Sequence, residues 1–461
     1  MKYQDTIAAI AVSSKNGSIS VIRISGDDSL KIVSEIFFNA KNEKISLESC
    51  QTHTIQYGFI QNAKNELLDE VLVLIMKAPR SYTAEDVVEI QCHGGAFICQ
   101  KILELLVEKG VRIAEPGEFT KRAFLNGRLD LSQAESVMDV IRSKSKVALE
   151  NSLSQLTGKV KEKIVSLREM ILEDIAFLEA ALDDPEHISL EDFSSVMGEH
   201  TKLLREEVKY LLDNSENGRI IKEGIRTVIV GKPNVGKSSF LNCILRENRA
   251  IVTDIPGTTR DTLEEELMIG QTLLHLVDTA GIRNTEDKIE SIGIEKAKQS
   301  VKEADFVICI LDSSEELSEE DKNIFNLMRK KQGIILLNKS DLTSVILPEQ
   351  IQKMTEKKVL PFSAATGEGL RELEAYLNER FMLGSVSYQD EIYITNMRQK
   401  QALYETAESL RNLSESIEAG MPEDLYSIDL YNAYESLGKI IGETVEDDIV
   451  DKIFKDFCMG K

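Results

Sequence analysis

Residues 231–238 read Gly-Lys-Pro-Asn-Val-Gly-Lys-Ser and match the pattern G-x-x-x-x-G-K-[ST]. An apolar run at 227–230 precedes them and Ser-Phe-Leu-Asn follows at 239–242, so the match lies where a buried strand turns into a helix. In this context backbone N–H groups face a phosphate, Lys237 reaches its oxygens, and the Ser238 hydroxyl holds Mg²⁺. An ordinary glycine-rich turn could produce part of the pattern. The stretch predicts a phosphate-binding loop.

Four further stretches favour a guanine nucleotide. The loop 254–261 offers Thr259 as a second hydroxyl ligand of Mg²⁺. Residues 278–281 read Asp-Thr-Ala-Gly at the end of a predicted strand, where the carboxylate reaches Mg²⁺ through water and the glycine N–H meets the γ-phosphate. Residues 338–341 read Asn-Lys-Ser-Asp, and this aspartate can accept both donors of the guanine N1–H and N2–H₂ edge. Residues 363–365 read Ser-Ala-Ala and present a backbone N–H to guanine O6.

These stretches together predict one GTP site. Its expected residues are Asn234, Val235, Gly236, Lys237, Ser238, Ser239, Thr253, Asp254, Ile255, Pro256, Gly257, Thr258, Thr259, Asp278, Thr279, Ala280, Gly281, Asn338, Lys339, Asp341, Ser363 and Ala364.

Length and composition bound the architecture and the compartment. A chain of 461 residues exceeds one core, so about three domains are expected. No apolar run approaches the roughly 20 residues of a membrane span, and the start has no basic region, so we expect a cytoplasmic protein.

Six cysteines without C-x-x-C spacing predict reduced thiols, not disulfides or a zinc site. The net charge of −23 means that an RNA partner must meet a local basic patch or be presented by a second protein.

Residues 1–118 are predicted to form an α+β domain. Strands are expected at 6–12, 19–26, 70–76 and 86–92, and helices at 29–38 and 96–109. Arg23 lies among alternating apolar residues, and a solvent-facing strand position is the simpler explanation for it. His93, beside two glycines, is explained by a turn as readily as by catalysis. Composition alone assigns this domain no function.

Helical patterns dominate two separate parts of the chain. An apolar stripe from Leu149 to Leu182 repeats every eleven residues and predicts one long, straight helix that stops at Asp183-Asp184-Pro185. A second helix is expected at 196–212. We therefore predict one helical domain made of residues 119–215 and 384–461, with an α/β P-loop GTPase domain at 216–383 inserted between its halves.

The motifs as a set resemble those of the tRNA-modifying GTPases of the MnmE (TrmE) family, along the whole chain and in order. They are the loop with Asn234, Gly257-Thr258-Thr259-Arg260, the Arg23 segment, His93-Gly94-Gly95, Phe-Leu-Asn-Gly-Arg-Leu-Asp-Leu at 124–131 and Phe-Cys-Met-Gly-Lys at 457–461. The resemblance implies a folate-binding N-terminal domain that also dimerises, a discontinuous helical domain and a Ras-like G domain. It also implies that the protein works with the flavoprotein MnmG to add a carboxymethylaminomethyl or aminomethyl group at C5 of wobble uridine 34 of certain tRNAs.

The resemblance implies roles for five residues around a reduced folate, such as the 5-formyl or methylene form. Arg23, Glu89, Arg128 and Lys461 would bind the folate, and Cys458 would lie near it as a candidate catalytic residue. Two departures from the family pattern stand out. Met459 replaces the usual isoleucine of Cys-Ile-Gly-Lys, a mild apolar change. Arg128 stands where many members have lysine, which keeps the cation but alters the geometry of its contacts.

Hydrolysis in this family differs from that in Ras. The water-orienting glutamine of Ras corresponds here to Ile282, which cannot hydrogen-bond. The resemblance points to Glu290, acting through a bridging water, although a solvated helix carboxylate explains Glu290 as well. It also implies K⁺ bound by Asn234, by the backbone carbonyls of Thr253 and Ile255, and by Thr258, which would neutralise charge between the β- and γ-phosphates. Arg260 and Arg283 remain conceivable arginine fingers.

Two other functions have to be weighed. A GTP-driven RNA-binding or ribosome-assembly factor would have a similar G domain, but such factors usually append a basic RNA-binding module. Residues 384–461 hold 7 Lys/Arg and 16 Asp/Glu, a net charge of 7 − 16 = −9, which disfavours that class. A non-enzymatic scaffold that binds GTP only to control dimerisation is harder to exclude, and a turnover measurement would separate it.

Overall fold

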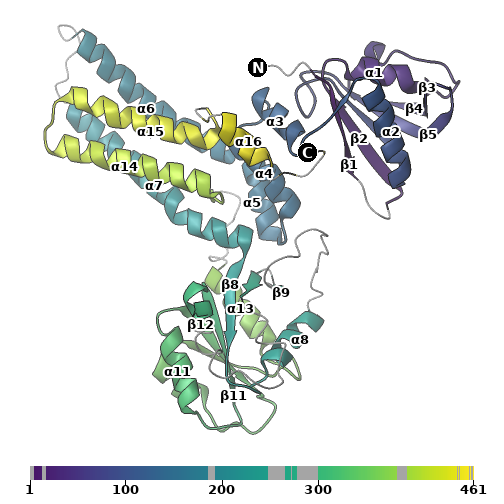
Figure 1. The fold of residues 1–461 in the computed structure, drawn as a ribbon. Coiled ribbons are helices and arrows are strands. Elements are labelled where there is room, and N and C mark those ends of the chain that lie inside the picture. The colour runs from purple at the N-terminus through teal and green to yellow at the C-terminus, as the bar shows by residue number, and fades with distance from the viewer. Residues whose placement is uncertain are drawn as a thin grey trace. The chain divides into compact units, whose positions relative to one another are not determined.

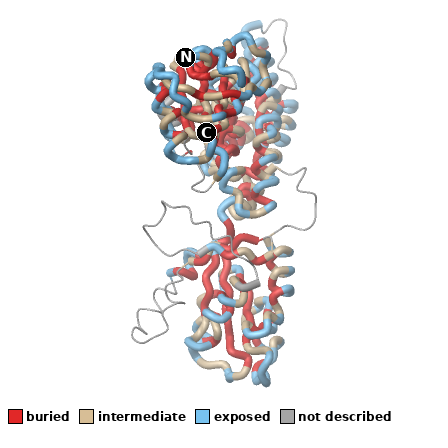
Figure 2. The backbone as a smooth tube through the Cα atoms, turned by 90° about the vertical axis from the view of Figure 1, so that its right-hand side faces the viewer, coloured by how far each residue is buried: buried red, intermediate tan, exposed pale blue. Residues whose placement is uncertain are grey.

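A computed structural model describes residues 5–12, 17–184, 193–247, 265–270, 272–277, 299–381, 392–443, 445, 447–455, 457 and 460. The chain divides into two compact units, and buried residues follow the strands and the inner helix faces of each (Figures 1 and 2). The first unit comprises Met1–Ile141, Ser152–Val208 and Gln401–Lys461. The second comprises Arg142–Asn151 and Lys209–Lys400.

The first unit contains a seven-stranded sheet in the order β3-β4-β5-β6-β2-β1-β7, antiparallel except where β1 meets β7. Its strands are β1 Ile7–Val12, β2 Ile19–Ser25, β3 Phe37–Asn39, β4 Thr54–Gln61, β5 Leu67–Met76, β6 Val87–His93 and β7 Arg112–Ile113. The helices α1 Ser29–Ile36 and α2 Ala96–Glu108 cover one face (Figure 1). The predicted strands and helices of this part are confirmed, and β3, β4 and β7 are additional.

Successive side chains of a strand point to opposite faces of the sheet, and this alternation decides which residues pack against α1 and α2. Ile22 and Ile24 of β2, and Ile90 of β6, belong to the core under α1 and α2. Arg23 and Glu89, on the same two strands, are directly opposite each other in register and face the other side of the sheet.

Helices complete the first unit and lead into the second. They are α3 Glu118–Leu125, α4 Leu131–Arg142, α5 Lys146–Leu156, α6 Lys159–Asp183, α7 Phe193–Glu223, α14 Met397–Glu418, α15 Tyr426–Ile441 and α16 Asp447–Lys455, with 3₁₀ turns at Leu47–Ser49 and Glu423–Leu425. The expected single helix from Leu149 to Leu182 is wrong. It breaks at Gly158, whose φ of 99° leaves the right-handed helical region, into α5 and α6.

The apolar stripe was nevertheless a correct guide to packing within α6. Ile164, Ile171, Ile175 and Leu178 are buried, whereas Leu182 at the end of the helix is exposed. The helix expected at 196–212 is longer than predicted and runs as α7 from Phe193 to Glu223.

The second unit is built on a six-stranded sheet in the order β13-β12-β11-β8-β10-β9. Its strands are β8 Ile225–Val230, β9 Glu265–Ile269, β10 Thr272–Leu276, β11 Phe306–Asp312, β12 Gln332–Asn338 and β13 Lys358–Pro361. All pair in parallel except β9, which is antiparallel to β10. The flanking helices are α8 Lys237–Glu247, α11 Glu319–Met328, α12 Pro348–Thr355 and α13 Leu370–Phe381.

The central strand β11 is buried along its whole length. Ile308 and Ile310 face one hydrophobic cluster, and Val307 and Cys309 face another on the opposite side of the sheet. A parallel sheet covered on both faces requires such a continuous apolar strand. The predicted α/β fold of this part is confirmed, and the carboxyl ends of β8, β11 and β12 lie at one edge, where open α/β sheets bind ligands.

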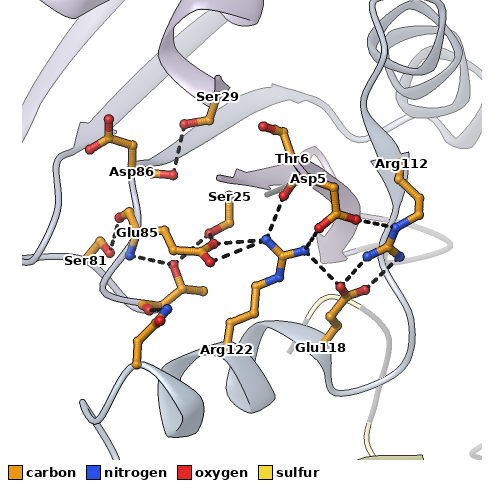
Figure 3. Close-up of polar contacts among 12 residues, drawn as sticks. Asp5, Thr6, Ser25, Ser29, Ser81, Glu85, Asp86, Arg112, Glu118 and Arg122 are labelled. Atoms are coloured by element: carbon orange, nitrogen blue, oxygen red, sulfur yellow. Dashed lines mark hydrogen bonds and ion pairs between the residues drawn. The ribbon is translucent and has the colours of Figure 1, made fainter. Parts of the chain in front are cut away.

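A buried guanidinium joins the sheet of the first unit to α3 (Figure 3). The Arg122 side chain is fully buried, and it donates to the Asp5 carbonyl at 2.8 Å and to the Asp5 carboxylate at 2.7 Å. It also contacts Glu85 at 3.2 Å and Glu118 at 3.1 Å. Arg112 reaches the same Glu118 carboxylate from β7. The start of β1, the β5–β6 loop and α3 thus meet at one charged cluster.

Ionisation of this cluster depends on its own arginines. Burial opposes the charge on Glu118, but hydrogen bonds from Arg112, from the Glu115 N–H and from Arg122 hold the pKa of Glu118 below its usual value. A carboxyl whose folded pKa is lowered stabilises the fold above its unfolded pKa, about 4.3, and this contribution is lost as pH falls through the folded value.

Among the described residues, no helix is both long and apolar enough to cross a membrane.

Replacing Arg122 by methionine should lower the free energy of unfolding by about 3 kcal/mol, because the change leaves the largely buried Glu85 and Glu118 carboxylates without their central cation. Arg411→Met is the matched control, since that side chain is 57 % exposed and pairs with exposed carboxylates of its own helix, so its loss should cost about 1 kcal/mol or less. Urea-induced unfolding at pH 7 and at pH 4 measures the free energy of unfolding of both variants. Equal losses for the two variants would contradict the central role of Arg122.

Candidate functional site

The predicted phosphate-binding loop connects β8 to α8 in the second unit. Lys237 opens α8, and its ammonium donates to the carbonyls of Gly231 at 2.7 Å and Lys232 at 2.6 Å. Burial lowers the pKa of this ammonium. Gly236 has φ 99°, and a Cβ there would lie 2.2 Å from the Asn338 amide nitrogen, so only glycine fits. The alternative of an ordinary turn is disfavoured, because the loop holds a half-buried ammonium at a helix N-terminus, an arrangement that suits a phosphate.

Two other predicted stretches pack against this loop. The Asn338 amide donates to the Val235 carbonyl at 2.7 Å and accepts from the Ala364 N–H at 3.0 Å. The Ser363 hydroxyl donates to the Asp341 carboxylate at 2.5 Å. Asp341 itself is exposed at the strand edge, with its position fixed by Ser363. One asparagine therefore ties the phosphate-binding loop to the expected base-binding segments, and an oriented carboxylate lies where a guanine edge could meet it.

Lys339 of the same stretch is held by a residue that the sequence did not single out. Its ammonium pairs with Asp312 at the end of β11, and Ser314 donates to the same carboxylate from its N–H and its hydroxyl. Burial opposes the charge on Asp312, but the hydrogen bonds from Lys339 and Ser314 hold its pKa below the usual range. Lys339 has φ 62°, which is uncommon outside glycine and is stabilised here by these contacts.

A second unpredicted contact anchors the loop from the other side. The Lys232 ammonium lies 3.0 Å from Asp321, whose side chain is 2 % exposed. Asp321 forms a capping box with Ser318 at the start of α11. The local signal for this pair was the sequence Ser318-Glu319-Glu320-Asp321, which marks a helix start, but no sequence pattern links it to Lys232.

Possible metal ligands are only partly described. Ser238 is exposed in the first turn of α8, and Asn234 is exposed in the loop with φ 65°, so oxygens of both can reach a cation beside bound phosphates. Within the described part of the chain, no group of three or more His, Cys, Asp and Glu side chains could hold a metal ion. A hydroxyl and an amide suit Mg²⁺ and K⁺, which prefer oxygen, and phosphates supply further ligands.

Several predicted residues lie outside the described part of the chain. They are residues 253–259, Arg260, residues 278–281, Ile282, Arg283, Glu290, Cys458, Met459 and Lys461.

The predicted folate residues converge in the first unit. Arg23 and Glu89 form an ion pair at 2.8 Å, with side chains 15 % and 16 % exposed. The interpretation of Arg23 as a solvent-facing strand residue is therefore wrong, because the face it occupies is covered there by Tyr82 and Phe119. The Arg23 guanidinium lies 5.0 Å from the Tyr82 ring centroid and 5.6 Å from that of Phe119.

Tyr82 brings the third predicted residue to the same place. The Arg128 guanidinium lies 4.9 Å from the Tyr82 ring centroid and donates to the Tyr82 carbonyl at 2.9 Å. The Tyr82 hydroxyl contacts Thr120 of α3 at 2.8 Å. From the end of the chain, the Gly460 carbonyl accepts from Arg23 at 3.4 Å. A carboxylate, two guanidiniums and aromatic rings suit an anionic ligand that carries a ring with N–H donors.

His93 ends β6 and is exposed, and its Nδ1 lies 2.6 Å from Asp69. The hydrogen bond to Asp69 raises the pKa of His93. The side chain lies at the strand end, as the turn interpretation predicted.

Comparison with known proteins gives matches along the whole chain. The family model described as "MnmE helical domain" matches residues 131–458, and "GTP-binding protein TrmE N-terminus" matches residues 6–128. A protein of Lachnoclostridium phytofermentans named "tRNA modification GTPase MnmE" is 53 % identical over 99 % of this chain and 99 % of its own. Proteins of the same name from Clostridioides difficile and Oceanobacillus iheyensis are 47 % identical over 100 % of both chains and 43 % identical over 99 % of both.

The base-binding geometry gives a direct test. Asp341→Asn replaces an acceptor pair by one acceptor and one donor, so GDP affinity should fall about 100-fold while xanthosine diphosphate, whose edge complements an amide, should gain affinity. Titration with fluorescent analogues of both nucleotides measures the exchange of preference. Asp305→Asn, at a carboxylate paired with Arg219 in the same unit, is the control and should leave the preference unchanged.

Proposed function

Because this chain belongs to the MnmE family, whose relatives above are named tRNA modification GTPases, we propose that it hydrolyses GTP in the modification of tRNA. The observation that carries the proposal is the Asn338 side chain, which joins the phosphate-binding loop at Val235 to the base-binding segment at Ala364. These contacts assemble the two ends of a guanine nucleotide site in one unit.

The hydrolytic step is proposed from the residues around the phosphates. Lys237 and the loop N–H groups bind the β- and γ-phosphates, while Ser238 and Thr259 hold Mg²⁺ and Asn234 is one ligand of K⁺. Bound cations would neutralise the charge that develops on the phosphate oxygens. Glu290 would orient the attacking water in place of the Ras glutamine.

The first unit is proposed to bind a reduced folate that supplies a one-carbon unit for C5 of uridine 34, with the flavoprotein MnmG as partner. The Glu89 carboxylate would accept from the N–H donors of the pterin ring, and Arg23 holds that carboxylate in place. Arg128 would meet the glutamate tail. Gly460 lies beside Arg23, which supports a role for the adjoining Cys458 and Lys461 at this site.

The outer face of the N-terminal sheet supports the proposed homodimer. Ile55 and Tyr57 of β4 are 59 % and 48 % exposed, and Leu72 of β5, directly opposite Tyr57, is 39 % exposed. Adjacent exposed apolar residues on a sheet face mark interaction surfaces. A second copy of the chain is the occupant that we propose, in the cytoplasm where tRNA is modified.

The ribosome-assembly alternative is disfavoured by the match of both family models over residues 6–128 and 131–458. Steady GTP turnover by the purified protein would exclude the scaffold alternative.

Potassium should accelerate hydrolysis. We expect a GTP turnover rate about tenfold higher in KCl than in NaCl at equal ionic strength, because a cation held by Asn234 would stabilise the transition state by roughly 1.4 kcal/mol. Asn234→Ala should remove the difference and leave GDP affinity nearly unchanged. Equal rates in the two salts for the unmodified protein would refute K⁺ dependence without affecting the GTPase proposal.

Folate binding should depend on Glu89. Glu89→Ala should weaken the binding of 5-formyltetrahydrofolate about 100-fold in isothermal titration, because two charge-assisted hydrogen bonds are lost. Glu104→Ala, at an exposed carboxylate of α2, is the control.

Cys458→Ser should preserve GTP hydrolysis and folate binding but abolish uridine 34 modification, measured by mass spectrometry of tRNA nucleosides from complemented cells. Normal modification in those cells would disprove the role of Cys458.

A further inference from the structure

The side chain of Lys232 attaches the phosphate-binding loop to the start of α11, and both lie within the second unit. Its ammonium lies 3.0 Å from the Asp321 carboxylate and 3.9 Å from that of Glu315. The Lys232 side chain is 16 % exposed, whereas that of Glu315 is 64 % exposed. An exposed carboxylate at the limit of ion-pair distance holds a cation only weakly. Asp321 is therefore the partner that fixes the Lys232 ammonium.

The Asp321 carboxylate is itself fixed and depends on this cation. Its Oδ2 accepts from the Ser318 N–H at 2.9 Å and from the Ser318 hydroxyl at 2.8 Å. Its Oδ1 is buried and has no hydrogen-bond partner among the described residues. A buried carboxylate with an unpartnered oxygen needs an ion pair to stay charged. Burial opposes the charge on Lys232, but the hydrogen bond to Asp321 raises the pKa of Lys232 above its usual value.

The main chain of Lys232 contacts the cation that is expected to meet the phosphates. The Lys237 ammonium donates to the Lys232 carbonyl at 2.6 Å and to the Gly231 carbonyl at 2.7 Å. Gly231 packs closely on β11, because a Cβ there would lie 2.4 Å from the Ile310 carbonyl oxygen. Pro233 follows Lys232 and restricts its backbone to extended conformations, which limits the directions of its carbonyl. A side-chain anchor on Lys232 therefore also fixes the carbonyl that orients the Lys237 ammonium.

We propose that Asp321, acting through Lys232, positions the Lys237 ammonium for GTP hydrolysis. The inference rests on the proposed function and adds a residue of α11 to it. Asp321 is a positioning residue, since its buried side chain reaches the ammonium only through Lys232. A misplaced ammonium weakens the transition state, in which charge develops on the phosphate oxygens, more than it weakens the binding of GDP, which the loop N–H groups also hold.

Single-turnover hydrolysis by the full chain, normalised to bound GTP, tests this role. Asp321→Asn keeps an oxygen for Ser318 and removes the charge that pairs with Lys232, so the rate should fall about tenfold while GDP affinity stays within about twofold. Lys232→Met should give the same loss, and Lys232→Arg should recover most of the rate because a guanidinium still reaches the carboxylate. Lys322→Met is the control, since that ammonium pairs with the exposed Glu319, and should leave the rate unchanged.

A double-mutant cycle shows whether the two residues act through one contact. Asp321→Asn combined with Lys232→Met should again lose about tenfold, whereas independent effects would multiply to about a hundredfold. Binding of GDP with aluminium fluoride, which imitates the transition state, gives an equilibrium measurement. Each single variant should bind this combination about tenfold more weakly and GDP alone nearly as well as the unmodified protein does.

A purely structural role of Asp321 in capping α11 predicts different results. It would lower the amount of protein that binds GTP but not the rate per bound GTP. An unchanged rate and an unchanged affinity for GDP with aluminium fluoride in Asp321→Asn, or losses that multiply in the double variant, would overturn the inference. If the unmodified protein bound GTP without hydrolysing it, the proposed function would fail, and the aluminium fluoride affinities would still decide the role of Asp321.

Discussion

The buried Arg122 guanidinium is the interaction on which the arrangement of the first unit depends. It holds Asp5 at the start of β1, Glu85 in the β5–β6 loop and Glu118 in α3. Tyr82 lies in the same loop as Glu85, and its hydroxyl contacts Thr120 of α3. The charged cluster therefore fixes the two segments that carry Tyr82 and Arg128, and with them the geometry around Arg23 and Glu89. Removing the guanidinium is costly because two of its partners, Glu85 and Glu118, have side chains only 12 % and 5 % exposed.

Local patterns predicted most of the described strands and helices, and the structure brings together Val235, Asn338 and Ala364 from three of the predicted nucleotide-binding motifs. Alternating apolar and polar residues, or continuous apolar runs, located β2, β5, β6 and the parallel strands. A strand that is buried on one face has apolar residues at every second position, and a strand buried on both faces is apolar throughout. The pattern failed at Gly158, where continuous helical periodicity concealed a break. The spacing of apolar residues indicates which side chains face a core. A residue with positive φ, such as Gly158, changes the direction of the chain without interrupting that spacing.

Ion pairs between distant segments could not be predicted, since no spacing rule relates their members. Lys232 and Asp321, Asp312 and Lys339, and Arg122 and Glu85 each meet only after the chain has folded. Tyr82 was missed for the same reason, although it contacts two of the predicted folate residues. The family resemblance named the residues expected to meet the ligand, and the structure adds the residues that hold them in place.

The net charge of −23 is compatible with phosphate ligands, because a protein binds a nucleotide and a tRNA through different groups. A nucleotide is bound by backbone N–H groups and a helix N-terminus, and such local dipoles act at short range whatever the sign of the whole surface. A tRNA has an extended backbone and requires many cations. Several cations of this chain are instead paired with its own carboxylates, as Arg122, Lys232 and Lys339 are. Under the function proposed above, affinity for tRNA is better supplied by a basic partner protein, while this chain contributes the nucleotide site and the proposed folate site.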